Sequence, residues 1–165
     1  MKPRIFSNPR KFTSTGLYAA ILAFTTLTIS SPAFAALGED SSSVQTDVVR
    51  MQGSLRSTQS QAFTVHEITA ATGTTVREYA SPSGKIFAVA WQGPWLPNMR
   101  QLLASYFAQY EEALQAGGPA RAGRRPLLIE QPGLVVQSGG HMRSFSGRAY
   151  IPQMMPQGVR AEDIR

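Results

Sequence analysis

The sequence of 165 residues contains no cysteine. This absence excludes disulfides, thiolate metal ligands, redox motifs and cysteine nucleophiles, so the fold depends on packing for its stability. Phosphate-binding loops and dinucleotide fingerprints are also missing, because no G-x-G-x-x-G or G-x-x-x-x-G-K pattern stands before a helical segment. Several classes of enzyme are excluded on these grounds alone.

The sequence also lacks an apolar run long enough to cross a membrane as a helix. Residues 17–29 are apolar and threonine-rich, but 13 residues of helix cover only about 20 Å against a hydrocarbon core of about 30 Å. A basic segment without acids precedes this run, and Ala33-Phe34-Ala35 places small residues where a signal peptidase reads. We therefore predict a signal peptide over residues 1–35, cleaved before Ala36. An uncleaved anchor is the alternative, and the short run argues against it.

Acidic residues are absent from the first 35 positions, and this changes how the net charge is interpreted. The whole chain has 16 basic and 10 acidic residues, a net charge of +6, which suggests a nucleic-acid binder. Cleavage removes four basic residues and leaves 12 against 10, a net charge of +2. We therefore expect no nucleic-acid partner, a periplasmic or secreted location, and no stable membrane insertion after cleavage. The remaining cluster, Arg121, Arg124 and Arg125, is interpreted as a solvated connector, with an anion or envelope-surface contact as the alternative.

Removal of 35 residues from 165 leaves 130, the length of one domain. We predict a single domain over residues 36–151 and an extended, partly disordered tail over 152–165. Val44, Val48, Met51 and Leu55 recur at helical spacing and predict a short N-terminal helix ending near Gly53. This helix is a candidate to cover the second face of the sheet. The polar segment 54–61 is interpreted as a connector.

Three segments rich in β-branched and aromatic residues follow, at 63–70, 74–80 and 85–91. Turn residues separate them, which predicts an antiparallel meander. The third segment is apolar on both alternating faces, as in an interior strand covered on both sides.

Residues 97–115 carry an apolar stripe at helical spacing and predict one long helix. Further strands are predicted at 127–131, 134–138 and 142–151, broken by Pro132-Gly133 and Gly139-Gly140. The predicted fold is therefore α+β, with an antiparallel sheet of about five to six strands packed by one long helix and a shorter N-terminal helix.

Candidate metal and catalytic sites find little support. A metal site would need His66 and His141 with a carboxylate such as Glu67 or Glu130, but His66 and Glu67 are adjacent on a predicted strand and point to opposite faces. Residues 138–141, Ser-Gly-Gly-His, suggest a serine hydrolase. They lack the G-x-S-x-G elbow between a strand and a helix, so a turn or bulge is the favoured interpretation. We predict no catalytic residues, no metal ligands and no cofactor.

The loop residues are better candidates for binding. Trp91 and Trp95 flank a Gln-Gly-Pro turn that leads into the predicted long helix. Tryptophans presented by a rigid turn are frequent anchors of protein interfaces. The alternative is that Trp91 belongs to the core and Trp95 packs under the helix. His141 and Arg143 supply polar groups which strand alternation would put on one face, with Arg148 on the other.

Several segments carry a family resemblance: FTVHEI at 63–68, VREYASPSG at 76–84, FAVAWQGP at 87–94 and SGGHMRSFSGRAYIP at 138–152. They resemble an uncharacterised family of exported proteobacterial proteins, domain of unknown function 2844. The resemblance implies export and a single compact domain. It implies no activity and no site residue.

From these observations we expect a non-catalytic exported accessory module that binds another envelope or secreted protein, through the Trp95 turn or an exposed strand edge. The alternative is a small-ligand-binding or hydrolytic protein with a pocket between sheet and helix, and with His141 and Arg143 near its mouth.

Overall fold

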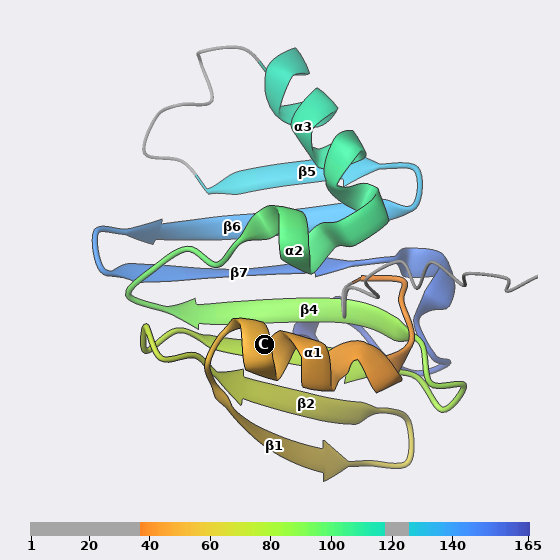
Figure 1. Cartoon of the computed structure of the whole chain (residues 1–165). Helices are drawn as coiled ribbons and strands as arrows, with labels where there is room; N and C mark the ends of the chain where they lie inside the picture. Colours follow the sequence, from red (N-terminus) through yellow and green to blue (C-terminus); the bar gives the residue numbers. More distant parts are fainter. Residues whose placement is uncertain (1–36, 118–125) are drawn as a thin grey trace, which may run out of the picture. The chain divides into compact units, whose positions relative to one another are not determined.

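A seven-stranded antiparallel sheet, in the order β1-β2-β3-β4-β7-β6-β5, is the frame of the protein (Figure 1). The computed structural model describes residues 37–117 and 126–165. The predicted signal peptide, its cleavage point, and the cluster of Arg121, Arg124 and Arg125 lie outside the described residues. The predicted α+β class with an antiparallel sheet is confirmed.

The elements follow the turn and capping residues of the sequence. The strands are β1 (Ser54–Gln59), β2 (Thr64–Thr69), β3 (Thr75–Ala80), β4 (Ile86–Gly93), β5 (Leu127–Gln131), β6 (Leu134–His141) and β7 (Ser144–Tyr150). The α-helices are α1 (Val44–Arg50), α2 (Met99–Leu103) and α3 (Phe107–Ala116). Short 3-10 helices are η1 (Ser41–Ser43), η2 (Ala104–Tyr106), η4 (Pro152–Met154) and η5 (Ala161–Asp163). Asn98 caps α2, since its side chain accepts a hydrogen bond from the backbone N–H of Gln101 at 3.3 Å.

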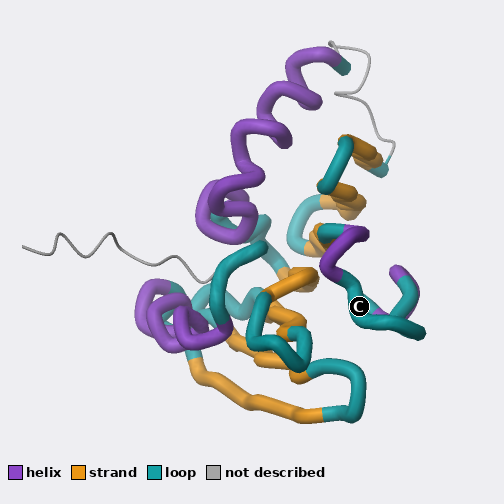
Figure 2. The backbone as a smooth tube through the Cα atoms, turned by 90° about the vertical axis from the view of Figure 1, so that its right-hand side faces the viewer, coloured by secondary structure: helices purple, strands orange, loops and turns teal. Residues whose placement is uncertain are grey.

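The sheet has two covered faces (Figure 2). The helices lie on one of them, which we call the helix face, and the C-terminal segment 152–165 lies on the other, which we call the tail face. β4 is the central strand, and its first six residues are all buried. This confirms the prediction of an interior strand that is apolar on both sides.

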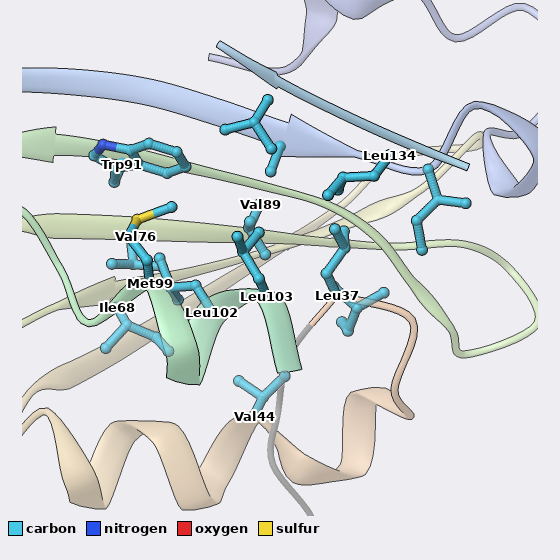
Figure 3. Packing of buried hydrophobic residues seen from close by; sticks show 14 of the residues in the cluster. Leu37, Val44, Ile68, Val76, Val89, Trp91, Met99, Leu102, Leu103 and Leu134 are labelled. Atoms are coloured by element: carbon cyan, nitrogen blue, oxygen red, sulfur yellow. The ribbon is translucent and has the colours of Figure 1, made fainter. Parts of the chain in front are cut away.

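The helix-face core joins α1 and α2 to the middle of the sheet. Figure 3 shows Met99, Leu102 and Leu103 of α2 directed at the strands. Their sheet partners in this core include Ile68, Val76, Val89 and Trp91. Val44 and Val48 of α1 belong to the same core. α1 therefore covers the helix face together with α2, and the suggestion that it covers the second face is wrong.

The tail-face core is built around the last residues of the described chain. Ile164 is buried with Ala88 and Ala90, whose small side chains leave room for it. The Tyr79 hydroxyl donates to the carbonyl of Arg165 at 2.7 Å and accepts from the backbone N–H of the same residue at 2.9 Å. The guanidinium of Arg148 donates to the carbonyls of Ala161 and Ile164. This packed segment, with its two short 3-10 helices, differs from the extended tail that the sequence predicted.

The predicted long helix is two helices with a break between them. Ala104 has a φ of +43°, and η2 separates α2 from α3. α2 packs over the centre of the sheet, whereas α3 contacts β5 at one edge. Because the strands of a sheet rotate relative to one another, one straight helix cannot follow both surfaces.

The strand count and one hairpin also differ from the prediction. The polar segment 54–61, predicted as a connector, contains β1. All side chains of β1 are exposed, as an edge strand allows. Gly139-Gly140 does not break β6, which continues to His141 and turns at Met142-Arg143. No helix of the described ranges 37–117 and 126–165 is long and apolar enough to span a membrane.

Candidate functional site

Trp95 lies in the loop between β4 and α2, and the residue is 58% exposed. The main chain at this position is held by the hydroxyl of Thr74, which donates to the Trp95 carbonyl at 2.8 Å and accepts from its N–H at 3.3 Å. Thr74 is buried at the end of the β2–β3 turn. Leu96, the next residue, is also among the exposed large apolar side chains. The loop therefore presents an indole to solvent on a fixed backbone.

Trp91, the second predicted anchor, is 2% exposed and belongs to the helix-face core (Figure 3). Its indole N–H has no hydrogen-bond partner among the described residues. The indole packs across β7 at Gly147, where a Cβ atom would come within 2.3 Å of Cζ2. Trp91 is thus inaccessible to a partner, and Trp95 is the accessible indole of the pair.

His141 and Arg143 lie at the β6–β7 hairpin. His141 is exposed at the end of β6, opposite Ser144. Arg143 is in the turn with a φ of +64°, outside either strand, so strand alternation does not relate it to His141. Between them, Met142 is 86% exposed.

The structure brings the Trp95 loop and this hairpin to the same end of the sheet. Gly93 at the end of β4 pairs with Phe145 of β7, and Phe145 pairs in turn with Gly140 of β6. Figure 1 shows the loop after β4 and the β6–β7 turn at that end. No hydrogen bond or ion pair joins Trp95 to His141 or Arg143, so the described side chains share an end of the fold without forming one cluster.

Pockets occur on both faces. One of about 620 Å³ and one of about 610 Å³ include Arg165 in their linings and lie against the tail face. A smaller one of about 160 Å³ lies between α3 and β5. Neither His141 nor Arg143 lines any of these three pockets.

The first histidine is engaged in a short polar contact. The Nδ1 atom of His66 lies 2.8 Å from the Ser57 hydroxyl on the neighbouring strand, and partial burial lowers the pKa of His66. Glu67 points the other way, to the tail face, and pairs with Arg77 at 2.6 Å. This confirms that His66 and Glu67 face opposite sides. Within residues 37–117 and 126–165, no group of three or more side chains is arranged to hold a metal ion.

A buried carboxyl pair connects the helices to the sheet. Asp47 of α1 and Glu78 of β3 are both fully buried on the helix face. The amide of Gln101 on α2 donates to Asp47 at 2.6 Å, while no donor from another described residue reaches either oxygen of Glu78. Burial, reinforced by the negative charge of Asp47, raises the pKa of Glu78 to about 9.

A raised pKa favours the protonated, neutral form of Glu78 at pH 7, beside the carboxyl of Asp47. Burial also raises the pKa of Asp47, and the hydrogen bond from Gln101 acts in the opposite direction. The same face of the sheet aligns Ser57, His66 and Glu78 in register. This row does not work as a catalytic triad, because nothing donates from His66 to Glu78.

Residues 33–164 match the model of a protein family described as "Protein of unknown function (DUF2844)". The chain belongs to the DUF2844 family. Neither a curated protein nor a solved structure matches it. The DUF2844 match covers the whole described sheet, together with its helices and nearly all of the tail segment. The family description names no activity.

Sequence reasoning missed the Asp47–Glu78 pair, although a signal was present. Glu78 stands between Val76 and Ala80 on the buried face of a strand, and Asp47 stands beside Val48 in a helix. An acid at an inward position is a buried charge that requires a partner or a proton. The identity of the partner was not readable, because 31 positions separate the two residues.

Proposed function

We propose that the protein is a non-catalytic exported accessory module that binds another envelope or secreted protein, with Trp95 as the anchor of the interface. The observation that carries the proposal is a tryptophan residue that is 58% exposed to solvent on a backbone held by Thr74. A large, rigid aromatic side chain loses little conformational freedom when a partner covers it. Exposed Leu96 beside it extends the apolar contact.

A free sheet edge is the second surface that could bind a protein partner. β5 is one edge of the sheet, and it is more apolar than the opposite edge, β1. A partner could add a strand to β5 through its main-chain groups. We place the anchor at Trp95 because a single well-presented aromatic residue contributes more binding energy than an average edge contact.

The test is site-specific photocrosslinking in cells that express the full-length chain. A photoreactive phenylalanine replaces Trp95 in one variant and Glu130 on β5 in a second. In the matched control it replaces Val49, an exposed apolar residue of α1. We expect one defined exported protein to be crosslinked from position 95, and Ala36 to be the first residue of the recovered chain.

Each part of the proposal has its own contrary result. The same products from positions 95 and 49 would remove Trp95 as the anchor. A specific product from position 130 alone would move the interface to the β5 edge. Recovery of a chain that still begins at Met1 would contradict cleavage and export.

A further inference from the structure

We propose that the open pocket of about 620 Å³ on the tail face binds a small amphipathic anion, a carboxylate with an apolar body. This proposal is independent of Trp95 and does not require a protein partner. The pocket lies against β4, β7, β6 and β5, and the end of the tail segment forms one wall. The lining residues that carry the argument are Leu128, Gln137, Ser146, Arg148, Ile164 and Arg165.

The charged side chains of the lining all have one sign. Among the described residues, Arg148 and Arg165 line the pocket and no acidic side chain does. Within the described ranges the guanidinium of Arg165 has no ion-pair partner. Arg148 is fixed in place, since its Nε donates to Gln137 at 2.7 Å and its Nη1 to the tail carbonyls. An anion in this pocket would meet one pre-positioned and one adjustable positive charge.

The lining also has an apolar part. Leu128, which is 47% exposed, lines the pocket together with Ile164, which is 1% exposed. Gly139 has no side chain and that of Ser146 is small, so neither residue fills the pocket. A hydrocarbon chain placed there would remove the exposed surface of Leu128 from water.

The neighbouring tail-face pocket is a poorer candidate for an anion, although its volume of about 610 Å³ is similar. Glu67 and Asp163 line it as well as arginines. Arg77, one of those arginines, already pairs with Glu67 at 2.6 Å. The positive charge of this pocket is thus partly neutralised, since three arginines and two acids leave a net side-chain charge of +1, against +2 in the first pocket.

The test is a titration of the full mature chain with three eight-carbon probes. Binding is monitored through the NMR signals of the backbone amides. The probes are octanoate, octanamide and octylammonium, which share the apolar chain and differ in charge. We expect octanoate to shift the amide signals of Gly139 and Gly147. Octanamide should bind about tenfold more weakly, the effect of one charge-assisted contact, and octylammonium should not bind. Equal affinities for octanoate and octanamide, or no saturation by octanoate below its micelle concentration, would overturn the proposal.

Variants locate the site. Ser146→Phe fills the pocket and should abolish binding of octanoate, whereas the control Ser144→Phe, on the same face of β7 but outside the lining, should not. Arg165→Gln should lower the affinity for octanoate several-fold and leave the affinity for octanamide unchanged. If Ser146→Phe does not fold, Leu128→Asp replaces it, with Leu55→Asp on the opposite edge strand as control. An equal loss of octanoate binding in a variant and its control, or no loss of binding in either, would contradict this location of the site.

Discussion

The indole of Trp91 lies against the backbone of Gly147, so closely that a Cβ atom on Gly147 would stand 2.3 Å from Cζ2 and 2.6 Å from the Gln137 carbonyl oxygen. A core tryptophan on the central strand thus dictates the absence of a side chain on the neighbouring strand. The contact joins β4 to β7 and, through Gln137, to β6.

We predict that Gly147→Ala destabilises the protein by about 1–3 kcal/mol, the usual cost of overpacking a core. The measurement is urea denaturation, monitored through tryptophan fluorescence. Gly139→Ala is the matched control on β6, since its added Cβ would meet only Pro126, at an ordinary 3.7 Å. A Gly147→Ala variant as stable as the Gly139→Ala variant would show that Trp91 moves aside at no cost.

The second prediction is that stability falls as the pH rises from about 5 to about 9. In the unfolded chain Glu78 loses its proton near 4.5, whereas the folded protein retains it until about 9. The unfolded state therefore binds fewer protons over that interval and becomes progressively more favoured. Urea midpoints at a series of pH values measure this dependence.

Glu78→Gln should reduce this dependence, because the amide cannot ionise and can still donate to Asp47. Its stability relative to the wild type should increase towards pH 9. Glu130→Gln, at an exposed position of β5, is the control and should follow the wild-type curve. Identical curves for Glu78→Gln and the wild type would show that Glu78 is not the titrating group.

The third prediction concerns a substitution that changes partner binding and leaves the stability of the fold unchanged. Trp95→Ala should weaken binding of the partner captured by crosslinking by about 2 kcal/mol or more, as expected for an aromatic hot spot. The melting temperature should change little, since the indole is largely exposed. His141→Ala, also exposed and at the same end of the sheet, should leave both quantities nearly unchanged. A loss of partner affinity confined to His141→Ala would favour a site at the hairpin.

The fourth prediction concerns the tail segment. Arg148→Met should loosen residues 161–165, because it removes the donors to the carbonyls of Ala161 and Ile164. Trypsin should then cleave after Arg160 faster than in the wild type, as detected by mass spectrometry. Arg143→Met, in the exposed hairpin turn, is the control. Unchanged cleavage in Arg148→Met would show that Tyr79 and the burial of Ile164 hold the tail by themselves.

Much of the secondary structure could be predicted from the sequence, because local patterns report which side of an element is buried. Residues 85–91 are apolar on both faces of a strand, which predicted an interior strand, and β4 is one. The polar residues 54–59 carried no such pattern, so β1 was missed. An edge strand with both faces in water needs only a backbone partner, which β2 supplies.

The candidate site was less predictable. Trp91 and Trp95 have the same side chain and lie four positions apart, yet one is in the core and the other is in solvent. The difference depends on β7, which places Gly147 against the indole of Trp91, and on Thr74, which fixes the backbone of Trp95 in the loop. Both partners come from distant parts of the sequence.

By itself, the sequence determined the absence of cysteine chemistry, the α+β class and the burial of the central strand, because composition and periodicity are local properties. Only the tertiary structure decided that the helix breaks at Ala104, that residues 152–165 cover the second face, and that Asp47 meets Glu78. The physical reason is that a pattern specifies which face of an element avoids water. The surface that covers this face is selected by packing between segments far apart in the chain.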